Sequence, residues 1–309
     1  MNLKDELPII EMSDSIKSWV TLAPGEFSCF DVDRDLDLQG VDIKRVRTLA
    51  LEKLVEEGVL DHVGSRRGFY RPAKRELESI DMAEADDTPL DIWLPFAMHK
   101  LVNVLPGNII TIGGEKNAGK TGYLLNLAFD NRNRFQVHYF NSEMGPGEIK
   151  LRCQKYCESN RIGFSEWNKV NFYERSDAFS DVIFTGKNSL NIIDFYECHD
   201  EFYKMGEGIR KIHDRLDGGL AFIAIQKNPG NDDPVGGRRV TEKSRVHVNI
   251  SYNYGIEYPH KLKIVVGKNW ADPTVNPTGY CVDYKLANGC YFKTAVNPHE
   301  PTKWWYYSK

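Results

Sequence analysis

The fold of this chain is decided by the stretch Asn108-Ile109-Ile110-Thr111-Ile112-Gly113-Gly114-Glu115-Lys116-Asn117-Ala118-Gly119-Lys120-Thr121. Its apolar first part, residues 109–112, predicts a buried strand, and the apolar spacing of residues 122–128 predicts a helix that follows directly. Between the two, residues 114–121 fit the pattern Gly-x4-Gly-Lys-Thr. A strand, a glycine-rich loop and a helix in this order are the setting in which this pattern binds phosphate.

The residue types of the loop indicate the ligand. Glycines let the backbone wrap around an anion, and the helix N-terminus directs free N–H groups and partial positive charge at it. In this pattern Lys120 reaches the β- and γ-phosphates, and the Thr121 hydroxyl ligates Mg²⁺. The sequence therefore predicts a bound nucleoside triphosphate, and a glycine-rich turn that binds nothing is the alternative. The nucleotide is expected to lie on Gly114, Glu115, Lys116, Asn117, Ala118, Gly119, Lys120, Thr121 and Gly122.

Length and composition leave room for two domains in a cytoplasmic protein. The chain has 309 residues, of which 41% are hydrophobic. No apolar run is as long as a membrane span, and the N-terminus lacks the basic-then-apolar order of a signal peptide. The six cysteines have neither a disulfide-like nor a zinc-like spacing. We therefore expect free thiols in the reducing cytosol and no membrane partner.

Residues 1–75 predict a small domain of three helices and a hairpin. Helices are expected over residues 13–22, 31–38 and 43–57, and strands over residues 59–63 and 68–71. This order resembles a winged helix-turn-helix, whose third helix enters the major groove and whose hairpin touches the DNA backbone. The resemblance implies DNA contacts from Lys44, Arg45, Arg47, Arg66, Arg67 and Arg71.

The charge of this region leaves a second interpretation open, a module that binds another protein. Residues 1–85 contain 12 Lys and Arg against 18 Asp and Glu, so any DNA contact would come from local basic patches. An acidic winged helix equally suits a module that binds another protein. The acidic residues 76–100 are expected to form a linker.

Residues 101–309 predict an α/β domain, a mostly parallel sheet flanked by helices. Apolar strands alternate with helical stretches, as they do in such sheets. The last three strands lack helical crossovers and are expected to extend one edge in antiparallel fashion. The strands are expected over residues 109–112, 136–140, 190–194, 221–225, 246–252, 262–266 and 281–286.

Polar residues end three of these strands. Asp194 is placed to hold the Mg²⁺ shell, and a simple helix cap is the alternative. Glu143 is a candidate to orient and deprotonate the attacking water, with Glu197 as its rival. Gln226 is placed to contact the γ-phosphate or its water and to pass the nucleotide state to the loop that follows.

These elements resemble the RecA-like ATPases and, within them, the ring helicases of the DnaB type. The resemblance covers residues 101–292. Ser142-Glu143-Met144 is similar to the family's Ser-x-Glu-Met, whose glutamate is the catalytic base, so it favours Glu143 over Glu197. Residues 192–195 resemble the Walker B strand, and residues 224–226 resemble the sensor strand. The resemblance implies Mg²⁺-dependent hydrolysis of ATP in a ring or filament of identical subunits.

Residues 263–270 resemble the hairpin that carries a basic finger to the neighbouring subunit's nucleotide. Lys268 fits the family's lysine, but Trp270 stands where the family has an arginine. Such an arginine stabilises charge in the transition state. Fast hydrolysis is therefore not expected unless Arg238, Arg239 or Arg245 substitutes.

The glycine-rich loop 227–239 is the expected element for single-stranded DNA. In RecA-like rings the corresponding loop lines the channel and grips phosphates, here through Lys227, Arg238 and Arg239. Asp232 and Asp233 oppose this interpretation, and an ordinary surface loop is the alternative.

The leading hypothesis is a DNA-binding ATPase that acts in the replication or maintenance of DNA. The second is a slow ATP-dependent switch whose winged helix recruits protein partners. The third is an ATPase signalling module without nucleic acid.

Overall fold

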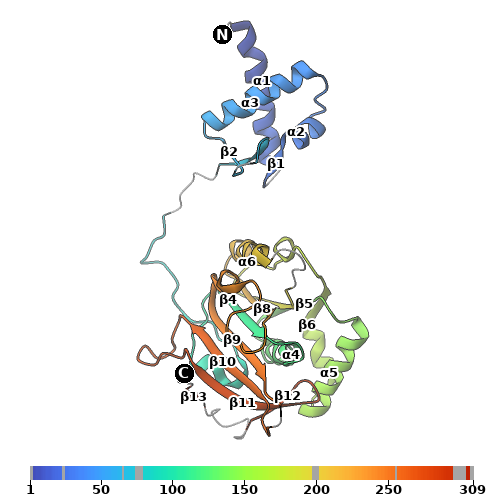
Figure 1. The fold of residues 1–309 in the computed structure, drawn as a ribbon, viewed down its shortest axis with the longest axis vertical. Coiled ribbons are helices and arrows are strands. Elements are labelled where there is room, and N and C mark those ends of the chain that lie inside the picture. The colour runs from blue at the N-terminus through green and yellow to red at the C-terminus, as the bar shows by residue number, and fades with distance from the viewer. Residues whose placement is uncertain are drawn as a thin grey trace. The chain divides into compact units, whose positions relative to one another are not determined.

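The computed structural model describes residues 3–22, 25–64, 66–73, 79–196, 202–254, 256–294 and 304–306. The chain divides into two compact units, residues 1–85 and 86–309, whose elements are labelled in Figure 1. None of the helices in the described ranges combines the length and apolarity that crossing a membrane requires.

Within its described residues, the first unit contains three helices and a three-stranded antiparallel sheet with the strand order β1-β3-β2. Its elements are α1 (Leu3–Leu22), β1 (Phe27–Ser28), α2 (Cys29–Asp35), α3 (Val41–Glu56), β2 (Leu60–His62) and β3 (Phe69–Pro72). α1 begins ten residues before the expected position and contains Pro8, a residue type that normally interrupts a helical pattern. Ile16, Leu51 and Leu54 are fully buried in the unit's core.

The second unit is built on a ten-stranded sheet. Nine strands form the path β12-β11-β10-β9-β4-β8-β7-β5-β6, and β13 pairs with β11. The strands are β4 (Ile109–Gly114), β5 (Gln136–Asn141), β6 (Val170–Glu174), β7 (Ser189–Asp194), β8 (Leu220–Gln226), β9 (Ser244–Tyr252), β10 (His260–Gly267), β11 (Tyr280–Ala287), β12 (Tyr291–Thr294) and β13 (Trp305–Tyr306). The helices are α4 (Lys120–Asn131), α5 (Pro146–Asn160) and α6 (Phe202–Arg215), with short 3₁₀ helices η1 (Pro95–Lys100), η2 (Phe164–Lys169), η3 (Phe179–Asp181) and η4 (Gly237–Thr241).

All seven expected strands are present, and the mostly parallel α/β sheet is confirmed. One detail was wrong: β9 pairs with β4 in parallel, so the antiparallel extension begins only at β10. Parallel strands are usually joined by a helix, but β8 and β9 are joined by a loop and the short η4. The sequence pattern therefore did not indicate a parallel pairing of β9.

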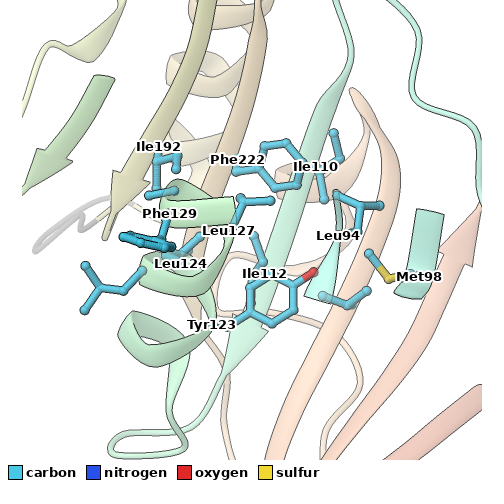
Figure 2. Packing of buried hydrophobic residues seen from close by; sticks show 14 of the residues in the cluster. Leu94, Met98, Ile110, Ile112, Tyr123, Leu124, Leu127, Phe129, Ile192 and Phe222 are labelled. Carbon is cyan, nitrogen blue, oxygen red and sulfur yellow. The ribbon is translucent and has the colours of Figure 1, made fainter. Parts of the chain in front are cut away.

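Alternate residues of the central strand β4 face two separate cores. Ile110 and Ile112 lie in the cluster that contains residues of α4 and α5, whereas Ile109 lies in the cluster that contains residues of α6. Figure 2 shows Ile112 near Tyr123 of α4, and Ile110 of the same cluster near Leu94 and Phe222. Helices therefore cover both faces of the sheet, which explains why β4 is a continuous apolar run.

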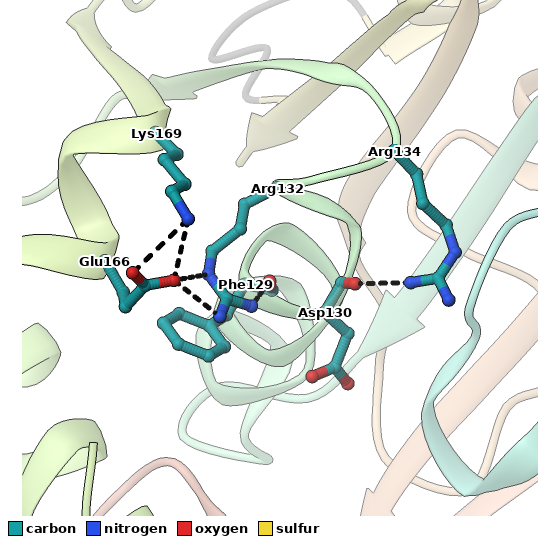
Figure 3. Close-up of polar contacts among 6 residues, drawn as sticks. All are labelled: Phe129, Asp130, Arg132, Arg134, Glu166 and Lys169. Atoms are coloured by element: carbon teal, nitrogen blue, oxygen red, sulfur yellow. Dashed lines mark hydrogen bonds and ion pairs between the residues drawn. The ribbon is translucent and has the colours of Figure 1, made fainter. Parts of the chain in front are cut away.

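The C-terminal end of α4 is fixed by Arg132 (Figure 3). Its Nε and Nη2 both donate to Glu166 Oε2 of η2, at 3.0 and 2.8 Å. The guanidinium carbon lies 3.6 Å from the centroid of the Phe129 ring. The two hydrogen bonds tie the C-terminal end of α4 to η2, and the cation–π contact with Phe129 of the same helix holds the guanidinium in place.

The predicted linker, residues 76–100, extends too far toward the C-terminus. Ile92 and Leu94 are buried in the core of the second unit, and Leu90 N donates to Val104 O at 2.8 Å. Trp93 exchanges two hydrogen bonds with the Asn131 side chain, each of 2.8 Å. The acidic residues around position 86 favoured the linker interpretation over the alternating apolar pattern of this segment.

Candidate nucleotide site

The loop between β4 and α4 has a backbone that its glycines make possible. Gly119, the N-cap of α4, has φ +98°, in the left-handed region that favours glycine. A Cβ placed on Gly114 would lie only 2.6 Å from Cγ of Lys120. The loop therefore lets its backbone and the start of α4 approach an anion closely.

Lys120 is the first residue of α4 and folds back over the loop. Its Nζ donates to the carbonyl oxygens of Gly114 and Glu115, at 3.1 and 3.0 Å. Burial lowers the pKa of Lys120, although the carboxylates of Asp194, Glu143 and Glu115 act in the opposite direction. A partly buried ammonium group that donates to neutral carbonyls fits a phosphate chain as its charged partner.

Asp194 lies at the end of β7 beside the loop. Its Oδ1 accepts a hydrogen bond from Thr121 Oγ1 at 3.3 Å, and its Oδ2 accepts one from Tyr139 OH at 2.6 Å. Burial raises the pKa of the Asp194 carboxyl more than these hydrogen bonds lower it. A carboxylate and a hydroxyl side by side are the oxygen donors that Mg²⁺ uses next to phosphates, so this pair fits the ion.

Glu143 is held in a turn that connects β5 to α5. Asn141 fixes this turn from within, because its side chain bonds to both the N–H and the carbonyl of Met144. Ser142 N donates to Asp194 O at 3.0 Å, and Phe195 N donates to Ser142 Oγ at 3.0 Å. The turn that carries Glu143 is thus joined directly to the strand end that carries Asp194.

A cavity of about 390 Å³ joins these groups. Most of the residues expected to hold and hydrolyse a nucleotide line it: Lys116, Asn117, Gly119, Lys120, Thr121, Gly122, Glu143, Asp194 and Gln226. Four further residues, Arg152, Phe195, Leu286 and Gly289, line it without having been expected. Arg152 is a helical residue nine positions after Glu143, and its only signal in the sequence was its charge.

Lys268, expected to act at a neighbouring subunit's nucleotide, and Trp270, which stands in the place of the family's arginine, lie elsewhere. Lys268 is not among the described residues that line the cavity, and its Nζ donates to Glu242 O at 3.4 Å. Trp270 is held within its own unit, because its Nε1 donates to Gly267 O at 2.8 Å and its backbone pairs with Val102. Glu197, the rival for the role of Glu143, lies outside the described residues.

Two of the nine expected DNA-contact residues are buried in ion pairs, so the structure does not present them to a phosphate. Lys227 is 3% exposed, and its Nζ donates to Glu115 Oε1 at 2.9 Å. Arg47 is 8% exposed, and its Nε and Nη2 donate to the two carboxylate oxygens of Asp33, at 2.9 and 3.0 Å. Both cations are satisfied inside the protein and are not available to a nucleic acid.

The remaining seven basic residues are exposed. Arg238 and Arg239 lie on η4, at the end of the glycine-rich loop. Arg238 makes one loose ion pair with Asp233, at 3.8 Å. In the first unit the exposed cations are Lys44 and Arg45 on α3 and Arg66, Arg67 and Arg71 on the hairpin.

Comparison with known proteins gives matches only among solved structures. No protein-family model and no curated protein sequence matches the chain. The KaiC-like protein PH0186 from Pyrococcus horikoshii OT3 superimposes with a TM-score of 0.50 and 12% identity, over 66% of this chain and 97% of that protein. A DnaB-like replicative helicase superimposes with a TM-score of 0.50 and 14% identity, over 68% of this chain and 65% of the helicase. At such identities the similarity concerns the fold, and it shows that the second unit has a RecA-like α/β fold.

Proposed function

We propose that this chain is an ATP-hydrolysing, DNA-binding protein of the RecA/DnaB-like class. The observation that carries the proposal is the 390 Å³ cavity, in which the phosphate loop, the Thr121–Asp194 pair and Glu143 meet. The fold supports a nucleotide-binding ATPase.

In this proposal each residue of the cavity has one task. Bound Mg²⁺-ATP supplies the phosphoanhydride bond that is hydrolysed. Lys120 exchanges its backbone carbonyl partners for the β- and γ-phosphates, and Thr121 and Asp194 hold the ion. Glu143 accepts the proton of the attacking water, and Gln226, at the end of β8, contacts the γ-phosphate or that water.

Single-stranded DNA is the proposed partner of the loop that follows Gln226. Arg238 and Arg239 are exposed there, and a second cavity of about 560 Å³ lies between the loop and strands β9 and β10. This cavity is mostly polar: Lys261 and Lys263 line it together with Asp232 and Asp233, and Lys263 is paired with Asp232 at 2.7 Å. Cations and backbone amides around a groove suit the phosphates of a single strand.

The first unit is proposed to act as a winged helix that contacts duplex DNA. Its order of α1, β1, α2, α3, β2 and β3 and its three-stranded sheet support this proposal. After Arg47 is removed from the set, Lys44, Arg45, Arg66, Arg67 and Arg71 remain as phosphate contacts.

The chain is also proposed to work in the cytoplasm as a homo-oligomer, a ring or a filament. In such an assembly ATP lies between subunits, and the exposed Lys268 reaches the neighbour's nucleotide. The hydrogen bond from Lys268 Nζ to Glu242 O is long, at 3.4 Å, so the side chain can leave this partner and extend toward a neighbouring subunit.

A slow ATP-dependent switch that recruits protein partners is the second candidate. Trp270 in the place of a trans arginine favours it, because the charge-stabilising group of fast members is missing there. Exposed apolar side chains of the first unit also favour it, since Phe30 is 70% exposed and Val41 is 86% exposed.

The steady-state rate of ATP hydrolysis, measured alone and with single-stranded or duplex DNA, tests the proposal. We expect Lys120→Ala to lose nucleotide binding or turnover. We expect Glu143→Gln to bind ATP but to hydrolyse it at least about 100-fold more slowly than the wild-type chain. Strong stimulation by single strands supports the DNA-dependent ATPase. A slow rate that is indifferent to DNA favours the switch, and normal turnover in Lys120→Ala contradicts the assignment of the site.

The same samples test the loop as a DNA site. Replacing Arg238 and Arg239 together with Ala is expected to weaken single-strand binding and to reduce the magnitude of the slope of log K against log salt by about 1.4, about 0.7 for each lost contact. Arg215→Ala, at an exposed arginine at the end of α6, is the matched control. Unchanged affinity and slope in the double variant would remove the loop from the DNA site.

A further inference from the structure

One tyrosine in the core of the second unit donates its hydroxyl hydrogen to an aspartate of the nucleotide cavity. Tyr139 lies on β5 and is fully buried, in the cluster that contains residues of α4 and α5. Its OH donates to Asp194 Oδ2 at 2.6 Å, and no other hydrogen bond of this hydroxyl occurs among the described residues. Tyr139 is not among the described residues that line the cavity. Any effect of its hydroxyl on the site must therefore pass through Asp194.

The pairing of β5 with β7 brings the two side chains together. The strands are parallel, and Tyr139 pairs with Ile192, two residues before Asp194. Side chains two residues apart on a strand point to the same face, so Tyr139, Ile192 and Asp194 share one face of the sheet. The ring of Tyr139 spans the distance along β7, and its OH reaches the carboxylate at the strand end.

The hydroxyl fixes the orientation of the Asp194 carboxylate. The last torsion of an aspartate side chain is broad and roughly two-fold, so the backbone alone does not decide which oxygen faces the cavity. Oδ2 is held by Tyr139, whereas Oδ1 accepts a hydrogen bond from Thr121 Oγ1 at 3.3 Å. The bond from Tyr139 is the shorter of the two, as expected of a hydroxyl that donates to a carboxylate. It therefore keeps Oδ1 beside Thr121, the other proposed ligand of Mg²⁺.

Asp194 is also held at its backbone by the end of β5. Ser142, directly after this strand, donates from its N to Asp194 O at 3.0 Å. The Ser142 Oγ accepts a hydrogen bond from Phe195 N at 3.0 Å. These contacts fix the strand end, and the hydroxyl of Tyr139 fixes the carboxylate that the strand end carries.

Packing alone does not require this hydroxyl. A phenylalanine ring has nearly the same shape, and burying a hydroxyl is unfavourable unless it makes a hydrogen bond. Tyr123 of α4 lies in the same cluster and is also fully buried, but its OH has no partner among the described residues. The two tyrosines thus differ in one respect, the carboxylate partner of Tyr139.

We propose that Tyr139 is a positioning residue for the proposed magnesium site, whose hydroxyl keeps Oδ1 of Asp194 beside Thr121 and available to the ion. This inference rests on the proposed ATPase function. Groups that hydrogen-bond to metal-binding side chains orient them, and their removal typically weakens metal binding by about 10- to 100-fold. Tyr139 takes no part in making or breaking bonds, and its proton stays on the hydroxyl oxygen.

The Mg²⁺ dependence of nucleotide binding tests this role apart from turnover. The ligand is AMP-PNP, an ATP analogue whose nitrogen bridge between the β- and γ-phosphorus resists hydrolysis. Calorimetry measures its affinity in EDTA and over a series of Mg²⁺ concentrations. Tyr139→Phe removes only the hydroxyl. Tyr123→Phe is the matched control, because it removes a buried hydroxyl that has no partner among the described residues.

We expect Tyr139→Phe to need about tenfold more Mg²⁺ for half-maximal tightening of AMP-PNP binding, and to stay within about threefold of the wild-type affinity in EDTA. Tyr123→Phe should match the wild-type chain in both measurements. In the background of Asp194→Asn, adding Tyr139→Phe should change the Mg²⁺ dependence no further, because the carboxylate through which the hydroxyl acts is gone.

An unchanged Mg²⁺ dependence in Tyr139→Phe would overturn the role of the hydroxyl, even if the melting temperature of the variant falls. An equal loss of affinity in EDTA and in Mg²⁺ would overturn it as well, since the tyrosine would then support the shape of the site and not its metal ligand. A wild-type chain that does not bind AMP-PNP, or binds it equally with and without Mg²⁺, would instead remove the proposed function itself.

Discussion

At the residue scale, burial changes the acid–base behaviour of Asp130, near the end of α4 (Figure 3). Burial raises its pKa to about 6 from an ordinary value of 3.8, although the cations of Arg132 and Arg134 act to lower it. The folded chain therefore binds this proton more tightly than the unfolded chain. The contribution of Asp130 to stability is greatest below about pH 4 and is lost as the pH rises through about 6.

Asp130→Asn should accordingly stabilise the fold at neutral pH. The uncharged amide removes a burial penalty of about 1–3 kcal/mol at about pH 7.5, and this gain should fall to less than half at about pH 4.5. Urea unfolding of both proteins at the two pH values measures the difference. Asp177→Asn, at an exposed aspartate, is the control. A gain of the same size at both pH values would contradict the titration of Asp130.

Most of the cavity could be predicted at this scale, because residues that end parallel strands meet at one edge of the sheet. Asp194 and Gln226 end their strands and Glu143 follows its strand directly, so pattern and topology together placed them beside Lys120. The burial of Arg47 and Lys227 could not be predicted in this way. Their partners Asp33 and Glu115 lie 14 and 112 residues away, and only the folded chain brings such charges together.

At the scale of elements, the phosphate loop is tied to the start of the loop that follows β8. Lys227 N donates to Gly114 O at 3.1 Å, and Lys227 Nζ donates to Glu115 Oε1 at 2.9 Å and to Asn231 O at 3.2 Å. Farther along, Asn249 Nδ2 of β9 donates to Asp232 O at 2.7 Å. We therefore expect a change at the phosphate loop to reach the proposed DNA loop through this buried ion pair.

Lys227→Met should uncouple the two loops. Removing the cation leaves Glu115 partly buried without its partner, at a cost of about 3 kcal/mol in unfolding free energy, and it should abolish the response of ATP hydrolysis to single-stranded DNA. The double variant Lys227→Met with Glu115→Gln should recover most of the stability but not the response. Urea unfolding and DNA-stimulated turnover separate the two effects. A normal response in the double variant would contradict coupling through this pair.

Elements with strong period were predictable, and elements defined by their neighbours were not. Buried strands such as β4 and β7 are continuous apolar runs and were expected within two residues of their observed ends. β6 was not expected, because Val170–Glu174 mixes polar and aromatic residues at the edge of the sheet. The parallel pairing of β9 with β4 depends on the crossover connection between β8 and β9, and the apolar pattern of β9 itself does not indicate that connection.

At the scale of the whole molecule, each unit has a core of its own. The described core residues of the first unit lie between Ile9 and Tyr70, and those of the second begin at Ile92. Independent cores indicate that each unit folds without the other. Whether a separated second unit folds and binds nucleotide therefore depends on where the fragment begins. The segment before β4 matters most, because its apolar residues belong to the core of this unit.

Two fragments that differ by fifteen residues test this boundary. The fragment 86–309 retains Ile92, Leu94, Phe96 and Met98, which are all buried in the core of the second unit. The fragment 101–309, which begins at the domain start expected from the sequence, loses them. Burial of one such side chain contributes about 1.5–3 kcal/mol, so four of them approach the whole stability of a typical domain, about 5–15 kcal/mol.

We therefore expect the fragment 86–309 to unfold cooperatively and to bind ATP as the full chain does. The fragment 101–309 should be unfolded or should lose its cooperative transition, because the removed side chains leave an open core under α4 and β4. Thermal denaturation followed by circular dichroism, with and without Mg²⁺-ATP, measures both. Cooperative unfolding and full nucleotide affinity in the shorter fragment would show that residues 90–100 are a dispensable linker after all.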